Sequence, residues 1–538
     1  MSIEHIEHEV HAFLDACVSP LQALRRERNL AHWNLATTGE ARYADEVARL
    51  SSRLMTHLNQ PDDWAHICAL YARRDEIRDE HLHRRLTLAY QQYAHQQRSP
   101  AQISRIAALE TELYRLFSTF RATLEGQPLT DNDIVQILCM ERDSARRQAA
   151  WEAGKQIGAQ AAPKIRELAA LRNAAAQAQG WSDYYAMALA LQEIDEQELF
   201  TLLETLEQQT RAPFLERKAA IDAVLAERFG LKPEELRPWH YSDPFFQKPP
   251  QTGEVDLDAL FADQDVVALT LATCDVLGLE VRDILARSDL YERPGKNQHA
   301  FCLHIDPLSD DVRVLANLRP DVKNMETCLH EFGHAIYDKY LGADLPFLLR
   351  KPAHISTTEA GAMMLGRLAR NAAWLERVRG LTGAQVQSLT AAVQAAESNK
   401  QLIFVRWALV MVFFERDLYR FPELDLDQRW WEYVTRFQAV PRPEGRDAPD
   451  WAAKIHLATN PVYYHNYILG ELTASQLLET IRQQTGATLV ENPAAGKFLQ
   501  KEIFARGATL PWNALLARVT GEPLTPRAYI ADFVHRQG

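Results

Sequence analysis

The spacing of apolar residues predicts a mainly helical protein. Apolar side chains recur at three- and four-residue steps through most of the chain, which is the period of an amphipathic helix. Residues 4–230 are also rich in Ala, Leu, Glu, Arg and Gln, which all favour helices. The clearest helices that we predict there cover residues 41–58, 100–124, 143–179 and 197–229.

The alternation that is typical of strands is scarce. Residues 299–305 and 312–318 form two short strand-like runs, separated by the turn-rich residues 306–311. They predict a small β-hairpin directly before the amphipathic stretch 321–340. Such a hairpin is suited to holding an extended peptide by strand addition, but it is equally suited to covering the helix, and the sequence does not decide between the two.

The chain shows no repeat and no low-complexity linker. With 538 residues, of which 47% are hydrophobic, it is long enough for a large core. The proline-rich residues 237–251 and 441–449 predict loops rather than domain boundaries. The apolar run 402–414 is interrupted by Arg406 and is too short to cross a bilayer, so it predicts a buried helix. We therefore expect a single domain over residues 1–538.

The charge and the cysteines indicate a cytoplasmic protein without nucleic-acid or membrane partners. A net charge of −13 and the lack of a basic block argue against nucleic acid and anionic membranes. Residues 1–20 contain four acidic residues before any lysine or arginine and no apolar core, unlike a secretory signal. The cysteines lack Cys-x-x-Cys spacing and are predicted to be free thiols: Cys17, Cys68, Cys139, Cys274, Cys302 and Cys328.

The most informative motif is His330-Glu331-Phe332-Gly333-His334. Two histidines four residues apart on a helix lie on one face, one turn apart, where both can bind a single Zn²⁺. Glu331 beside them is suited to act as the general base for a metal-bound water. The motif lies within the amphipathic stretch 321–340, which predicts the helix that this geometry requires.

A zinc site of this kind needs a third protein ligand, and Glu359 is the best candidate. It lies in the apolar stretch 355–368, which predicts a second helix capped by Ser or Thr. A lone glutamate among small and apolar residues is costly to bury unless it is paired or binds a metal. His354 and Glu326 are weaker candidates for the third ligand.

Residues 454–467 combine lysine, histidine and tyrosine within a short segment. The tyrosines, together with His456, are suited to stabilising an oxyanion, and Lys454 is suited to binding a carboxylate. Segments rich in tyrosine and histidine more often serve in packing, so the segment alone is weak evidence for a site.

Several short motifs follow one another in a recognisable order: Ala31-His32-Trp33-Asn34, His299-Ala300, His330–His334, Thr358-Glu359-Ala360, Trp430-Trp431-Glu432-Tyr433, Ala453-Lys454-Ile455-His456, Tyr464-His465-Asn466-Tyr467 and Leu510-Pro511-Trp512. With them the chain resembles the angiotensin-converting enzyme family of zinc peptidyl-dipeptidases along nearly its whole length. The helix that carries the two histidines also resembles the thimet oligopeptidase family. The fold that the first resemblance implies is a two-lobed helical ellipsoid with a deep channel and no linker between the lobes.

The resemblance implies a role for each residue of the zinc centre. His330, His334 and Glu359 would bind one Zn²⁺ per chain. Glu331 would be the general base that later protonates the leaving amine. The implied activity is hydrolysis of small unstructured peptides with release of C-terminal dipeptides.

Further residues would bind the substrate. The resemblance implies that Tyr467 and His456 stabilise the tetrahedral oxyanion, and that His299 and the backbone at Ala300 hold the scissile region. Lys454 and Tyr464 would bind the free C-terminal carboxylate.

The sequence departs from the family pattern at a cysteine position, at the arginine that serves chloride activation and at the glutamine that helps to bind the substrate's carboxylate. Gln298 stands where secreted members carry a cysteine, and Asn466 replaces the arginine that serves chloride activation. The glutamine that helps to bind the carboxylate has no clear counterpart, because Tyr241 occupies about that place. A weaker grip on the carboxylate would favour a thimet-type oligoendopeptidase that cuts internally.

A fourth departure concerns the surroundings of the metal. Met363 stands where the family carries an aspartate, and Glu326 or Asp338, each one helical turn from a ligand histidine, is a candidate replacement. An alternative of another class is a catalytically silent helical peptide-binding protein, which the intact motif argues against.

Overall fold

The computed structural model describes residues 3–250, 257–486, 488–490 and 493–534. Most of these residues are helical, which confirms the predicted class. The strands of the described ranges form two small antiparallel hairpins, β1 (Ala122–Leu124) with β2 (Gln127–Leu129) and β3 (Phe301–Asp306) with β4 (Asp311–Leu315). The second hairpin is the one that the sequence predicts.

The chain folds as two compact units, each built from separate stretches of sequence. Unit 1 is formed by Met1–Gln97, Val255–Val393 and Leu469–Ala528, and unit 2 by Arg98–Glu254, Gln394–Ile468 and Tyr529–Gly538. The chain passes from one unit to the other within three helices, α16 (Gly383–Arg420), α19 (His465–Thr485) and α22 (Arg527–Phe533). One domain over the whole chain, with a deep channel, stays a prediction.

The remaining helices of unit 1 are α1 (Ile3–Thr38), α2 (Ala41–Leu58), α3 (Pro61–Ala72), α4 (Glu80–Gln96), α11 (Val266–Leu277), α12 (Arg282–Arg287), α13 (Val322–Lys339), α14 (Ile355–Gly366), α15 (Ala372–Arg377), α20 (Pro493–Phe498) and α21 (Trp512–Thr520). Those of unit 2 are α5 (Pro100–Thr119), α6 (Asp131–Met140), α7 (Ser144–Lys155), α8 (Ile157–Gln177), α9 (Tyr184–Leu191), α10 (Glu196–Phe229), α17 (Leu426–Gln438) and α18 (His456–Thr459).

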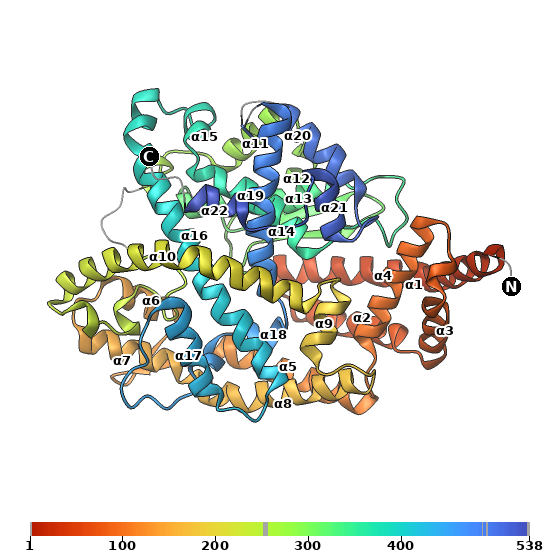
Figure 1. Cartoon of the computed structure of the whole chain (residues 1–538), viewed down its shortest axis with the longest axis horizontal. Helices are drawn as coiled ribbons and strands as arrows, with labels where there is room; N and C mark the ends of the chain where they lie inside the picture. Colours follow the sequence, from red (N-terminus) through yellow and green to blue (C-terminus); the bar gives the residue numbers. More distant parts are fainter. Residues whose placement is uncertain (1–2, 251–256, 487, 491–492, 535–538) are drawn as a thin grey trace. The chain divides into compact units, whose positions relative to one another are not determined.

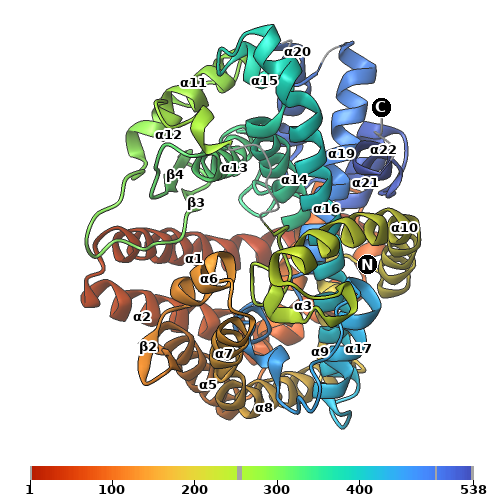
Figure 2. The ribbon, with the colours of Figure 1, turned by 90° about the vertical axis from the view of Figure 1, so that its left-hand side faces the viewer.

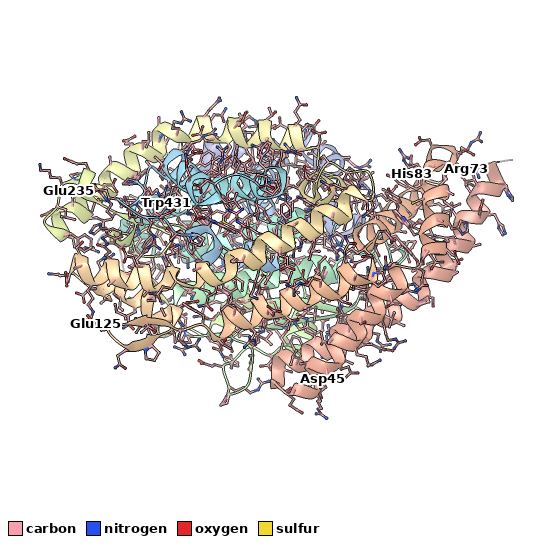
Figure 3. All side chains as sticks on the ribbon, turned by 90° about the horizontal axis from the view of Figure 1, so that it is seen from below. Asp45, Arg73, His83, Glu125, Glu235 and Trp431 are labelled. Carbon is pink, nitrogen blue, oxygen red and sulfur yellow. The ribbon has the colours of Figure 1, made fainter. Side chains whose placement is uncertain are left out.

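Two predicted helices differ from the structure. The helix predicted over residues 100–124 ends at Thr119, because Glu125 and Gly126 have positive φ angles of 53° and 78° and turn the chain into the β1–β2 hairpin. Figure 3 shows Glu125 at this exposed turn, whereas Trp431 lies among packed side chains. The helix predicted over 143–179 is interrupted at Gln156, whose N–H bonds the carbonyl three residues back.

The apolar run 402–414 is buried within α16, as predicted. Its charged residue, Arg406, forms a buried ion pair with Glu207 at 2.9 Å. No helix within the described ranges is both long and apolar enough to cross a membrane. All six cysteines are free thiols, as predicted.

The β3–β4 hairpin is held between α1 and α13 in unit 1 (Figure 2). Phe301 pairs with Leu315, and Trp33 of α1 packs against Ile305 and Leu315. On its other side β4 forms a bridge with Asp289. In the described part of the chain β3 is therefore the edge strand of this small sheet.

Helices α13 and α14 lie side by side in unit 1 (Figures 1 and 2). Asp321 caps α13 by accepting a hydrogen bond from the N–H of Asn324. The cap of α14 is His354, whose ring Nδ1 accepts from the N–H of Ser356, so the predicted Ser or Thr cap is wrong. An imidazole nitrogen replaces the hydroxyl because it supplies the same acceptor.

Gly333 makes the close contact between α13 and α14 possible. A Cβ atom added at Gly333 would lie 2.5 Å from the Cα of Ala362, which no real contact allows. The two helix backbones therefore touch at this glycine. A glycine inside a helix normally destabilises it, so its presence here has a packing reason.

We expect Gly333→Ala to lower the free energy of unfolding by about 1–3 kcal/mol, because α14 must move away from the added methyl group. Urea unfolding measures the change. Gly361→Ala is the matched control, since an added Cβ there meets the Cδ2 atom of Tyr337 at an ordinary 3.7 Å. Equal stability of the two variants would show that the close contact does not constrain the fold.

Candidate functional site

The structure brings three predicted metal ligands together in unit 1. His330 and His334 lie on α13, and Glu359 lies on α14. The Oε2 atom of Glu359 is 3.7 Å from Nε2 of His330 and 3.9 Å from Nε2 of His334. The ligand atoms of the three residues all lie within 4.8 Å of one another. We call these three residues the His-His-Glu group.

Packing against α19 helps to bury Glu359. Gly470 on α19 lies so close that an added Cβ would be 2.9 Å from the Cβ of Glu359. Glu359 is only 7% exposed, and both histidines are half-buried. A buried carboxylate beside two imidazoles is the kind of donor set that suits a divalent cation.

His334 is held in the state that a metal ligand requires. Burial, with a contribution from His330, lowers the pKa of His334 to about 3, so the ring is neutral. Its Nδ1 lies 2.8 Å from Oγ1 of Thr358. When Nδ1–H donates to this hydroxyl, the lone pair of Nε2 points toward Glu359. Two imidazoles and one carboxylate form a donor set that fits Zn²⁺.

Thr358 is a residue of the site whose role the sequence did not predict. It stands directly before Glu359 in the motif Thr358-Glu359-Ala360, but nothing in its type identifies it as the partner of His334. The contact depends on how α14 is rotated against α13, which becomes visible only in the structure.

Glu331 is buried next to the His-His-Glu group. Its carboxylate accepts a hydrogen bond from the backbone N–H of Cys302 on β3. Burial, followed by the negative charge of Glu359, raises the pKa of Glu331 to about 8. A divalent cation at the neighbouring ligands would favour the charged form and lower this pKa. The geometry thus places a proton acceptor between the ligand helix and an edge strand.

The weaker ligand candidates are engaged elsewhere in unit 1. Glu326 forms an ion pair with Arg370, and His354 caps α14. The group of potential ligand atoms found in the described part of the chain contains neither Glu326 nor His354. Asp338, a candidate replacement for the family's aspartate, faces His304, with 3.8 Å between Oδ1 and Nδ1.

His299 and Ala300 lie directly before β3. His299 is exposed, and its N–H donates to Oδ1 of Asn297 at 2.9 Å. On β3 itself, the Cys302 N–H bonds Glu331 and the His304 carbonyl accepts from Asn29 at 3.0 Å, so both face away from β4. Because alternate residues of a strand direct their backbone groups to the same side, Ala300 continues this edge.

In unit 2 the structure assembles a group around Lys454. The Nζ atom of Lys454 donates to Oε1 of Gln247 at 3.0 Å and lies 5.2 Å from the ring centroid of Trp407. Burial lowers the pKa of Lys454 to about 8, while Asp243 favours its charged form. Lys454 therefore keeps most of its positive charge at neutral pH.

Tyr464 completes this group. Its hydroxyl oxygen accepts a hydrogen bond from Nε1 of the buried Trp407 at 2.8 Å. Its hydroxyl proton can therefore be donated to a further acceptor. We refer to Lys454, Gln247 and Tyr464 as the Lys-Gln-Tyr group. Their ammonium, amide and hydroxyl donors suit the binding of a carboxylate.

The glutamine that lies beside Lys454 is Gln247, whereas the sequence has Tyr241 at about the place of the family's carboxylate-binding glutamine. Tyr241 is engaged elsewhere, because its hydroxyl bonds Lys218 at 2.8 Å and Asp222 at 3.0 Å. The loop before Gln247 is shaped by Asp243, whose carboxylate accepts hydrogen bonds from the N–H groups of Phe245, Gln247 and Lys248. This turn directs Gln247 toward Lys454.

The other predicted residues of unit 2 lie close to the Lys-Gln-Tyr group. The ring of His456 is 5.1 Å from that of Tyr464, and the ring of Tyr467 is 5.3 Å from it. Burial, followed by the charge of Lys454, lowers the pKa of His456 to about 4, so His456 is neutral. Asn466 donates to Oε1 of Gln192 at 3.3 Å.

Comparison with known proteins shows that the chain is similar to metallopeptidases. The sequence model described as peptidase family M3 matches residues 137–535, and that described as angiotensin-converting enzyme matches residues 4–235. The angiotensin-converting enzyme-like protein Ace3 of Mus musculus is 23% identical over 455 residues, which cover 76% of this chain. These residues span 60% of the length of Ace3.

Both resemblances inferred from the motifs are thus confirmed. The M3 match contains the His-His-Glu group on α13 and α14 as well as the Lys-Gln-Tyr group. Because this match covers well over half of the sequence, the chain belongs to peptidase family M3, a family of zinc-dependent metallopeptidases, and it is related to angiotensin-converting enzyme.

Proposed function

We propose that this protein is a zinc peptidase that releases dipeptides from the free C-terminus of small unstructured peptides. The observation that carries this proposal is the Lys-Gln-Tyr group, which brings together the ammonium of Lys454 and the amide of Gln247, both half-buried, with the buried phenol of Tyr464. A protein that cut only within peptides would have no need for such a group. In a chain that belongs to a metallopeptidase family, such a group favours an enzyme that cleaves at a fixed distance from the substrate's C-terminus.

The His-His-Glu group would hold one Zn²⁺ per chain. When bound, zinc supplies the positive charge that polarises a scissile carbonyl and makes water a better nucleophile. Glu331 would take the proton of the attacking water and pass it to the leaving amine. Its burial and its raised pKa suit a group that must both accept and release a proton.

The remaining roles follow the family resemblance. Tyr467 and His456 would donate hydrogen bonds to the oxyanion, and a neutral imidazole can do so through its N–H. The strand edge that begins at His299 and Ala300 and passes Glu331 would hold the peptide backbone. These assignments, together with a cytoplasmic location, remain proposals.

A second candidate function is that of a thimet-type oligoendopeptidase. It is favoured by the match to peptidase family M3, which covers more of the chain than the match to angiotensin-converting enzyme. Gln247 beside Lys454 argues against this candidate, because it supplies an amide where the sequence suggested a weaker grip on the carboxylate. A catalytically silent peptide-binding protein would have no need for a buried acid beside three metal ligands.

Thr358→Val should weaken zinc binding about 10- to 100-fold, because the variant keeps the shape of the side chain but loses the oxygen that orients His334. Competition with a chromophoric chelator measures the affinity. Thr358→Ser keeps the hydroxyl and should bind zinc nearly as the parent does. If the valine and serine variants bind zinc equally well, Thr358 does not orient His334.

Glu331→Gln should retain zinc and lower kcat roughly 10²- to 10⁴-fold, because the amide cannot accept the proton of the attacking water. Metal analysis and a peptide-hydrolysis assay on the same preparation measure both quantities. A zinc-loaded variant with near-normal turnover would exclude Glu331 as the general base.

Lys454→Ala should cost about 2–4 kcal/mol in kcat/KM for free-acid peptides, because the buried ammonium no longer meets the terminal carboxylate. Matched peptides with an amidated C-terminus are the control and should respond little. In the parent, preference for free-acid over amidated peptides should fall as the pH rises through about 8, where Lys454 loses its proton.

Mass spectrometry of the products completes this test. The proposal predicts fragments shortened by two residues from the free C-terminus. If the parent cleaves amidated and free-acid peptides equally well, and Lys454→Ala affects both alike, the oligoendopeptidase alternative is correct.

A further inference from the structure

The segment that carries His456, Tyr464 and Tyr467 contains a strained residue. Val462 has a φ of 52°, in the left-handed region, and its side chain is buried. A β-branched residue rarely adopts this conformation, which is disfavoured by a factor of roughly 5 to 30. Such strain persists only where the surrounding structure enforces it.

Two side chains from other helices hold the backbone of Val462. Its N–H donates to Oε1 of Glu415 on α16 at 2.7 Å, and its carbonyl accepts from Nε2 of Gln192 at 3.3 Å. Gln192 is the C-cap residue of α9. Because the N–H and the carbonyl lie on either side of the same Cα atom, the two contacts together fix its φ and ψ angles.

Glu415 is an unusual residue for such a position. It is 3% exposed, and burial raises its pKa to about 8 despite the nearby Arg172. An acid buried this deeply is destabilising unless its hydrogen bonds compensate. Arg172 itself donates to the carbonyl of Ala458 at 3.3 Å, so the same segment is also held further upstream.

Gln192 also contacts the other end of the strained turn. Its Oε1 accepts a hydrogen bond from Nδ2 of Asn466 at 3.3 Å, while its Nε2 donates to the Val462 carbonyl. One side chain thus bridges the backbone carbonyl of Val462 and the side-chain amide of Asn466, which lie on either side of Tyr464 in the sequence. Asn466 is fully buried, so this contact lies inside unit 2.

We propose that Glu415 and Gln192 are positioning residues that hold Val462 in its left-handed conformation and thereby fix Tyr464 and Tyr467 for substrate binding. The inference rests on the proposed function, because it assumes that Tyr464 binds the C-terminal carboxylate. Without the two contacts Val462 relaxes to a negative φ and the following backbone changes direction. Tyr464 then loses its hydrogen bond to Trp407 and its place beside Lys454.

Steady-state kinetics on free-acid peptides tests the proposal through Glu415→Leu, which removes the acceptor, and Glu415→Gln, which keeps it. Glu415→Leu should raise KM roughly 5- to 30-fold, the factor by which the strained conformation is disfavoured, while Glu415→Gln stays near the parent. Gln192→Leu should act in the same direction and serves if Glu415→Leu does not fold. A parental KM in both leucine variants would overturn the proposal.

A second substitution separates positioning from general loss of stability. Val462→Gly removes the penalty for a positive φ, so it should reverse most of the rise in KM that Glu415→Leu causes. Ala439→Gly is the matched control, because Ala439 has a φ of 51° at the end of α17, in the same unit. Rescue by Val462→Gly alone supports the proposal; equal rescue by both glycines, or by neither, contradicts it.

Amide hydrogen exchange gives a readout that does not depend on activity. The backbone N–H of residue 462 should be strongly protected from exchange in the parent and in Glu415→Gln. It should exchange readily in Glu415→Leu, whether residue 462 is valine or glycine. Unprotected Val462 in the parent would contradict the proposed contact. If protection follows this pattern but the parent does not prefer free-acid peptides, the proposed function fails while the positioning contact stands.

Discussion

The contact between α13 and α14 at Gly333 is the constraint on which the metal centre depends. Glu359 can reach the imidazoles of His330 and His334 because the backbone of α14 packs directly against this glycine. The contact also sets Thr358 against His334. The glycine between the two histidines of the motif therefore determines which residue of the second helix lies beside both imidazoles.

Burial explains why these residues suit a metal. Removing water from the site keeps His334 neutral and raises the pKa of Glu331, and both effects arise from desolvation before any other cause. In unit 2 the same effect lowers the pKa of Lys454 without removing its charge at neutral pH. Desolvation is thus the main cause of the pKa shifts of Glu331 and His334 in one unit and of Lys454 in the other.

The sequence predicts those features that follow from local rules. Residues 41–58 form α2 as predicted, and the amphipathic stretch 321–340 contains α13, because periodicity depends on neighbouring residues. Gln247 was not found, because its position beside Lys454 depends on the turn around Asp243. Nor does sequence spacing reveal that Val462 is strained, since the hydrogen bond that enforces this conformation comes from Glu415 on a distant helix.

One zinc ion held by the His-His-Glu group would make this protein a peptidase. Zinc is titrated into the metal-free protein, and hydrolysis of a free-acid decapeptide is followed at each addition. We expect activity to rise in proportion to bound zinc and to level off at one zinc per chain. Hydrolysis by the metal-free protein, or no hydrolysis once one zinc is bound, would contradict it.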